Sequence, residues 1–281
     1  MTADPGHGRH SADGVLRLTS FNLLHGMVVQ TGDATDPRPL RAAAAVLDSD
    51  VVALQEVDAG QSRSGGTDQT TEVAMAAGLA HRHFEPTVAG TPGEQWSALS
   101  ADSPAVAAGS PAGPRYGIGL ASRYPIRDLA VLPLGRARGR FPLLLPNGSV
   151  TMLADEPRTA LAARLDTPIG GVTVACAHLS FVPGWNVTQL VRLARWLDRL
   201  PGPRVLLGDL NMPALLTHAA RGWHPLAVVP TYPAPRPRIQ FDHVLASGGL
   251  GATVTEVTAR RLPVSDHCAL QVTLDRRSAV G

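Results

Sequence analysis

Short apolar segments of strand length recur along the whole chain. Several are apolar at nearly every position, which is typical of strands covered by another layer on both faces. The segments occupy residues 15–21, 51–55, 117–122, 159–165, 171–177, 204–208, 241–247, 252–258 and 268–274. This pattern predicts a sheet-rich domain whose strands are buried.

Stretches between these segments carry the spacing or the start signals of helices. Residues 40–47 are rich in alanine and follow Pro39, which the first turn of a helix tolerates because its missing N–H would be unpaired there. Residues 71–79 follow a run of threonine. Residues 187–200 place valine, leucine and alanine on one side and arginine on the other, which predicts an amphipathic helix with a solvated face. Helices that alternate with strands indicate an α/β domain.

Other segments lack periodicity and are expected to be loops. Residues 85–114 are rich in Pro, Gly, Ala and Ser, so we expect one long loop inside the domain. In the shorter loop at 58–69, Arg63 and Gln69 either reach a substrate or belong to a solvated surface. The string RARGR at 136–140 favours a solvated loop over a track for a phosphate backbone, because short charge runs usually face water.

The chain of 281 residues is long enough to bury a substantial core. We assign residues 15–275 to a single domain, residues 1–14 to a disordered tail and residues 276–281 to a second tail. No apolar run approaches the roughly 18 residues that a membrane helix needs, and the first residues do not read as a secretory signal. We therefore expect a cytoplasmic protein with no transmembrane segment, and we favour a monomer.

Composition removes several classes of chemistry. All 25 basic residues are arginine, which excludes Schiff-base catalysis and the lysine of a phosphate-binding P-loop. The formal net charge of +2 is too small to indicate a nucleic-acid partner by itself. Cys176 and Cys268 lie in apolar segments without the spacing of a metal pair, so we expect reduced core residues rather than a disulfide.

Polar side chains stand where the predicted strands begin or end. Asp209 and Asn211 follow the segment at 204–208, and they project together if the extended conformation persists through Leu210, because strand residues i and i+2 share a face. The other polar groups at strand ends are Asn22, Glu56, His178, Asp242, Asp266 and His267. Strands that lie side by side would bring these groups into one pocket.

The oxygen ligands in this set suit a hard cation. Asn22, Glu56 and Asp266 would bind Mg²⁺ or Mn²⁺, whereas the absence of clustered Cys and His argues against structural zinc. His178, His267 and one acid leave a second reading open, the two-His-one-carboxylate set of an iron oxygenase. The surplus of acids and amides favours phosphate chemistry.

A series of short strings carries a resemblance to a known family. The strings, in chain order, are FNLLHG, LQEVD, GIGLASRYPI, EPRTALAARL, CAHLS, GDLNMP, FDHVLAS and SDHCAL. Together they resemble the signature series of the endonuclease/exonuclease/phosphatase superfamily, which includes deoxyribonucleases, abasic-site endonucleases, neutral sphingomyelinases and inositol polyphosphate phosphatases. The resemblance implies a four-layer α/β sandwich, with two packed, mainly antiparallel sheets flanked by helices and the site at one end.

The resemblance also implies a role for each matching residue. Asn22 and Glu56 would hold the divalent metal with help from Asp266. Asp209 and Asn211 would position the attacking water and the scissile phosphate. Asp242 would orient His267, which acts as general base or general acid, and His178 would donate a hydrogen bond to a phosphate oxygen.

Several positions around these strings keep two interpretations. Arg158 either binds phosphate through its planar guanidinium or forms a salt bridge with Glu156 or another acid. Tyr116 either touches the phosphate or only packs. Many relatives of this family have an asparagine where this chain has Ile118, so a polar contact from that position is not expected. His25 is expected to be a turn residue near the metal or to support its ligands.

The residues and the resemblance favour a metal-dependent hydrolase of phosphate esters. We expect a phosphodiesterase of nuclease or phospholipid type that works by in-line attack of an activated water. The alternatives are a phosphomonoesterase on inositol phosphates or lipids and a catalytically inactive binding module. Phe181 and Trp185 would stack on a base, insert into a lipid interface or close the core, so they do not select the substrate.

Overall fold

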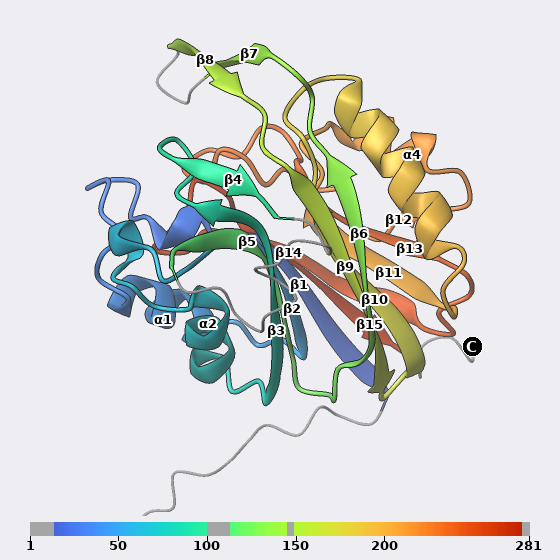
Figure 1. Cartoon of the computed structure of the whole chain (residues 1–281). Helices are drawn as coiled ribbons and strands as arrows, with labels where there is room; N and C mark the ends of the chain where they lie inside the picture. Colours follow the sequence, from blue (N-terminus) through green and yellow to red (C-terminus); the bar gives the residue numbers. More distant parts are fainter. Residues whose placement is uncertain (1–13, 100–112, 145–148, 277–281) are drawn as a thin grey trace, which may run out of the picture.

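The computed structural model describes residues 14–99, 113–144 and 149–276, and two large sheets that pack face to face form its centre (Figure 1). The strands are β1 (Val15–Asn22), β2 (Val51–Ala59), β3 (His81–Gly90), β4 (Trp96–Ala98), β5 (Arg115–Ser122), β6 (Arg127–Gly135), β7 (Arg140–Leu144), β8 (Val150–Ala154), β9 (Arg158–Thr167), β10 (Gly170–His178), β11 (Arg204–Asp209), β12 (His224–Pro225), β13 (Asp242–Ser247), β14 (Thr253–Arg260) and β15 (Ala269–Asp275). Each apolar segment of the sequence corresponds to one of these strands.

Most neighbouring strands run antiparallel. Within the described residues, one sheet has seven strands in the order β14-β15-β1-β2-β5-β3-β4, and the other has six in the order β12-β13-β11-β10-β9-β6. The pairs β1–β2 and β10–β11 are parallel and lie near the middle of their sheets. Because parallel neighbours end at the same edge, each sheet brings two strand ends together there.

Helices cover the outer faces of both sheets. Helices α1 (Arg38–Ala45) and α2 (Gln69–Ala76) pack on the seven-stranded sheet, and α4 (Trp185–Leu197) packs on the six-stranded sheet (Figure 1). The predicted α/β sandwich of two mainly antiparallel sheets flanked by helices is therefore confirmed.

Alternate residues of the central strands face different cores. In β2, Val51 and Ala53 belong to the core between the sheets, whereas Val52 and Leu54 face the helices α1 and α2. Strand β10 follows the same alternation beneath α4. Successive strand side chains point to opposite faces, so a strand covered on both sides is apolar at every position.

The prediction of one long loop at 85–114 was wrong for its first part. Strand β3 runs through Gly90 and pairs with β5, and β4 pairs with the end of β3. The register shifts between Pro86 and Val88, a bulge of the kind that accommodates a proline in a sheet. Half-exposed polar residues hide the apolar pattern of β3, and residues 100–112 of the predicted loop lie outside the described residues.

Other expectations concern the ends of the chain and its cysteines. Gly14 and Arg276, which the sequence assigns to the tails, are joined by a backbone hydrogen bond of 2.8 Å. The rest of both predicted tails lies outside the described residues. Cys176 and Cys268 are buried and free, as predicted. In the described part of the chain, no helix is long and apolar enough to cross a membrane.

The core between the sheets sets the stability of the fold. Leu120 of β5 is fully buried in this core, whereas Leu215 is 77% exposed. We expect Leu120→Ala to lower the free energy of unfolding by about 2–5 kcal/mol, since it removes buried contacts and leaves a cavity. Urea unfolding followed by circular dichroism measures this change, with Leu215→Ala as the control. Equal stability of both variants would contradict the assigned core.

Candidate active site

The ends of strands from both sheets meet through one buried side chain. Asn22, the last residue of β1, donates from Nδ2 to Glu56 Oε1 at 3.0 Å and to Asp209 Oδ2 at 2.9 Å. Glu56 belongs to the same sheet as Asn22, but Asp209 ends β11 in the other sheet. Asn22 therefore joins the sheets at the edge where their parallel strands end. Its own Oδ1 accepts from the backbone N–H of Leu24 at 3.0 Å.

Strand β11 ends at Asp209, so the expected extension through Leu210 does not occur. Asn211 has φ of 51°, in the left-handed region that asparagine tolerates, and its N–H donates to Asp209 Oδ1 at 2.9 Å. The two side chains still converge, because Asn211 Nδ2 lies 3.2 Å and Asp209 Oδ2 3.7 Å from His178 Nε2. A turn, not strand alternation, brings them together.

A glycine allows β10 and β11 to approach closely beside the site. A Cβ atom on Gly208 would lie 2.1 Å from the carbonyl oxygen of Ala177. The parallel register at this point pairs His178 with Asp209. The glycine of the GDLN string therefore keeps these two side chains adjacent.

Two carboxyl groups lie near the mouth of the site. Glu56 has φ of 53° and stands in a bulge between β2 and β5, where the register shifts between Leu54 and Val57. Burial raises the pKa of Glu56 to about 7; the hydrogen bond from Asn22 opposes this rise and the charge of Asp266 adds to it. Burial likewise raises the pKa of Asp266, against the charge of His267. A bound cation would stabilise both carboxylates in their charged form.

His267 lies between two acids. Its Nδ1 is 2.8 Å from Asp242 Oδ2, and its Nε2 is 3.8 Å from Asp209 Oδ2. Burial alone would lower the pKa of His267, but the carboxylates of Asp242 and Asp209 outweigh it and raise the pKa to about 10. Burial raises the pKa of Asp209 to about 6, against the charge of His267. Near neutral pH, the arrangement is an imidazolium held between carboxylates.

Tyr232 contacts this imidazole and was not identified from the sequence. Its ring centroid lies 4.9 Å from that of His267 and 5.3 Å from that of Phe241. Burial and the nearby acids, Asp266 first among them, raise the pKa of Tyr232 to about 12. The proline-rich string around it indicates only a loop, so the sequence holds no signal for this contact.

His178 faces a cation. Its Nδ1 lies 2.9 Å from Nη1 of Arg158, the first residue of β9. Burial, the charge of Arg158 and the charge of His267 all lower the pKa of His178 well below 6.5. His178 is therefore neutral and carries one N–H. Donor groups face both ring nitrogens: Arg158 Nη1 lies 2.9 Å from Nδ1 and 3.3 Å from Nε2, and Asn211 Nδ2 lies 3.2 Å from Nε2.

Arg158 is buried and incompletely paired. Its Nη2 lies 3.8 Å from Asp155 Oδ1, its Nη1 lies 4.0 Å from Glu156 Oε2, and its Nε has no hydrogen-bond partner among the described residues. Arg158 thus combines features of both sequence-based interpretations. Two carboxylates lie near it at 3.8 and 4.0 Å, as in a salt bridge, and its Nε–H is left to bind another group. An anion with several oxygens is the partner that a guanidinium in this state fits.

Two further acids lie beside the site. The sequence did not single out Asp155, and it named Glu156 only as a candidate salt-bridge partner of Arg158. Asp155 Oδ2 accepts from Ser180 Oγ at 2.7 Å and from the N–H of Ala137 at 2.8 Å. Burial raises the pKa of Glu156, against the charge of Arg158. The string EPR at 156–158 indicates a turn in the sequence. Only the structure shows that the hydrogen bonds of Asp155 connect this turn to Ala137 and Ser180.

The other candidate substrate-binding residues lie to one side. Arg63 donates to both oxygens of Asp58 at 2.8 Å, which occupies its planar fork, and it stacks over the ring of Tyr116 at 5.8 Å. Tyr116 is buried, which raises its pKa well above 10. Both residues support the wall of the site.

Residues of the neighbouring turns have structural partners. Gln69 does not reach a substrate, because it is buried, accepts from the N–H of Asp58 and donates to the carbonyl of His25. His25 lies in a 3₁₀ turn, as the sequence suggests. Ile118 is part of the core between the sheets. Trp185 is partly exposed at the start of α4.

Comparisons with known proteins agree with this geometry. The family model described as Endonuclease/Exonuclease/phosphatase family matches residues 19–267. Among curated proteins, none matches the sequence.

Solved structures share the fold at low sequence identity. An endonuclease/exonuclease/phosphatase from Beutenbergia cavernae DSM 12333 has a TM-score of 0.67 at 23% identity, covering 93% of this chain and 71% of that one. D. rerio TDP2 humanized by 14 mutations has a TM-score of 0.59 at 14% identity, covering 93% and 99%. A mannosyl-6-phosphatase from Bacteroides thetaiotaomicron VPI-5482 has a TM-score of 0.56 at 14% identity, covering 92% and 99%. The family model, matched over most of the sequence, decides the assignment: the chain belongs to the Endonuclease/Exonuclease/phosphatase family.

Proposed function

We propose that this protein is a divalent-metal-dependent hydrolase of phosphate esters, and most simply a phosphodiesterase. The observation that carries the proposal is the meeting of two kinds of group at one edge of the two sheets. Acids from both sheets, bridged by Asn22, lie beside an imidazolium at His267 and an incompletely paired guanidinium at Arg158. Acids can hold a cation, and the cationic side chains can hold the phosphate.

Glu56 and Asp266 are the side chains that would hold Mg²⁺ or Mn²⁺. Their donors are oxygens, as these cations prefer, and burial raises the pKa of both carboxyl groups, a cost that a cation would offset. Asn22 aligns Glu56 with Asp209, but its Oδ1 is already bonded to Leu24, so its proposed ligation requires that bond to break. When bound, the cation would neutralise charge on the phosphate as the P–O bond breaks.

Asp209 and His267 divide the proton transfers. The water is held by Asp209, whose carboxylate accepts its proton as the oxygen attacks phosphorus. His267 is protonated through its contacts with Asp242 and Asp209, so it would donate its proton to the ester oxygen that leaves phosphorus instead of acting as the base. Asp242 keeps the imidazole oriented through the hydrogen bond to Nδ1.

Arg158, His178 and Asn211 make the phosphate subsite. The unpaired Nε of Arg158 and the Nη2 on the same edge of the guanidinium would offer two donors to two phosphate oxygens. The single N–H of neutral His178 adds a donor that carries no charge. Asn211, whose Nδ2 donates to the carbonyl of Leu179 and faces His178 Nε2, positions that imidazole. The subsite therefore recognises a phosphate and not a particular alcohol.

The number of ester groups on the substrate separates this proposal from its main alternative. One of the similar structures is that of a mannosyl-6-phosphatase, so a phosphomonoesterase is the second candidate. Comparing bis-p-nitrophenyl phosphate with p-nitrophenyl phosphate distinguishes the two activities. Plasmid DNA, RNA, sphingomyelin and inositol phosphates then test the natural substrate class.

The remaining alternatives fit the geometry less well. An inactive binding module would not need an imidazole oriented by one acid and facing a second, as His267 is. An iron oxygenase would need His178 as a ligand, but the guanidinium of Arg158 lies 2.9 Å from its Nδ1 and repels a cation there.

We expect hydrolysis of bis-p-nitrophenyl phosphate to require Mg²⁺ or Mn²⁺. His267→Ala should lower kcat by about 100- to 10,000-fold, because it removes the proton donor. Asp209→Ala should lower it comparably. Release of p-nitrophenolate measures the rate, and urea unfolding verifies that each variant folds.

His224→Ala is the matched control, since His224 is exposed on β12. It should hydrolyse the ester at the rate of the unchanged protein. Full activity in EDTA, or an unaffected His267→Ala enzyme, would refute the proposed mechanism.

Arg158→Gln tests the phosphate subsite. Loss of a charged hydrogen-bond donor worth about 1.5–3 kcal/mol should lower kcat/KM by about 10- to 150-fold. Removing the positive charge should also raise the pKa of His178, which NMR titration of the imidazole resonances detects. Arg192→Gln, on the outer face of α4, serves as the control. Unchanged kcat/KM together with an unchanged His178 pKa would rule out this subsite.

A further inference from the structure

The hairpin of β7 and β8 stands apart from the body of the protein. Among the described residues its strands pair only with each other, and they project beyond the two large sheets (Figure 1). A two-stranded hairpin without a covering layer is marginally stable in water. The proposed hydrolysis does not use this element, so its exposed surface needs another explanation.

Both faces of this hairpin expose large apolar side chains, although its strands also include Arg140 and Thr151. Pro142 pairs with Met152, and Phe141 pairs with Leu153, so Met152 and Leu153 point to opposite faces. Val150 is 64%, Met152 47% and Leu153 38% exposed. An exposed hairpin in water is expected to be polar on at least one face. Apolar side chains exposed on both faces instead suit a hairpin that is surrounded by an apolar environment.

Basic residues form a collar at the base of the hairpin. Arg136, Arg138 and Arg140 are exposed, and residues 136–154 include no acid. Arg136 stacks over Trp96 of β4 at 5.3 Å, and Arg140 donates within the hairpin to the carbonyl of Met152 at 2.6 Å. The string RARGR thus places three arginines where the chain enters the hairpin, next to its exposed apolar side chains.

The base of the hairpin connects directly to the candidate active site. Asp155 follows β8 and accepts from the N–H of Ala137, which closes the two ends of the element. Arg158 follows three residues later and contacts His178. A hydrogen bond therefore ties the collar to the chain segment that leads to Arg158.

We propose that the β7–β8 hairpin docks the protein on an anionic lipid surface. Its apolar side chains enter the acyl region, and the arginine collar meets the lipid phosphates. This binding surface goes beyond the proposed hydrolysis and does not depend on it. A second copy of the chain would cover one face of the hairpin and leave the other in water. A nucleic acid would use the collar but leave the apolar residues exposed.

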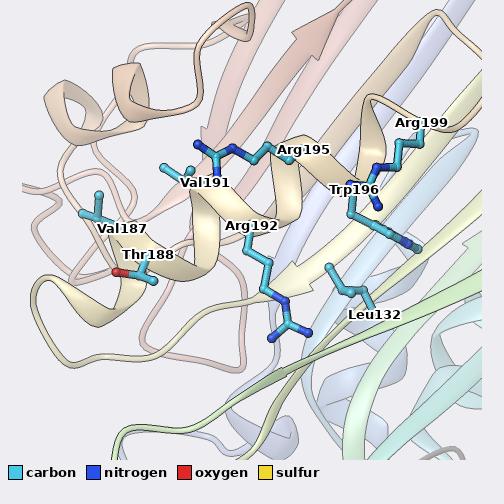
Figure 2. A pocket seen from close by; sticks show the side chains of 8 residues that line it. All are labelled: Leu132, Val187, Thr188, Val191, Arg192, Arg195, Trp196 and Arg199. Carbon is cyan, nitrogen blue, oxygen red and sulfur yellow. The ribbon is translucent and has the colours of Figure 1, made fainter.

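A second basic surface provides the comparison. Arg192, Arg195 and Arg199 line a pocket of about 600 Å³ between α4 and β6, together with Trp196 and Leu132 (Figure 2). There the apolar residues pack against the core beneath α4 instead of projecting from the surface. If lipid binding needs only positive charge, this surface should contribute as much as the collar.

Sedimentation with vesicles tests the proposal in EDTA, so that hydrolysis plays no part. The whole chain should bind vesicles of phosphatidylcholine with phosphatidylglycerol and should not bind phosphatidylcholine alone. Val150→Thr with Met152→Gln should weaken binding about tenfold, because both side chains become polar. Arg138→Gln should weaken it about fivefold, and Arg195→Gln should not.

Matched variants exclude general effects of the substitutions. Val228 is 75% and Met75 73% exposed, so Val228→Thr with Met75→Gln repeats the same chemical changes elsewhere. This control should bind vesicles like the unchanged chain. A fluorophore attached to Met152→Cys should shift to the blue on vesicles, whereas one on Met75→Cys should not.

The proposal is overturned if the unchanged chain does not sediment with anionic vesicles. It is equally overturned if the control variants lose binding as strongly as the hairpin variants. Light scattering that shows a dimer lost on Val150→Thr with Met152→Gln would assign the hairpin to a second copy. DNA that displaces the chain from vesicles without any effect of the hairpin variants would assign the collar to nucleic acid.

Discussion

The hydrogen bonds from Asn22 to Glu56 and Asp209 tie the two sheets together where their parallel strands end. At this edge the fold gathers acids that repel one another. The protein offsets that repulsion with a buried amide at Asn22 and an imidazolium at His267. The proposed divalent cation would offset the rest, at the edge where the sheets are joined.

The other side of the site has an excess of positive charge. Arg158 is a buried cation, and the carboxylates of Asp155 and Glu156 lie 3.8 and 4.0 Å from it. Its unpaired Nε and its contact with neutral His178 leave donors available to a phosphate. An acid-rich side and a donor-rich side thus lie next to each other, and a phosphate ester with a divalent cation would match both. The proposed lipid-docking hairpin would set where the molecule works, and a hydrogen bond from Ala137 to Asp155 ties its base to the segment that leads to Arg158.

The sequence predicts the strands well because they are covered on both faces and are apolar at every position. It fails at β3, where half-exposed residues and Pro86 remove that signal. At the site, polar residues at strand ends indicate the pocket, but strand alternation does not explain Asn211, which reaches His178 through a left-handed turn. Tyr232 could not be identified, because its role depends only on which loop packs against His267.

We propose that Glu56 and Asp266 hold a divalent cation beside a phosphate at Arg158. A crystal structure of the protein grown with Mn²⁺ and inorganic phosphate, with anomalous data at the manganese edge, tests this most directly. We expect one anomalous peak within ligand distance of Glu56 and Asp266, with phosphate oxygens on Arg158. A peak bound instead by Asp242 and His267, or no peak in the pocket, would contradict it.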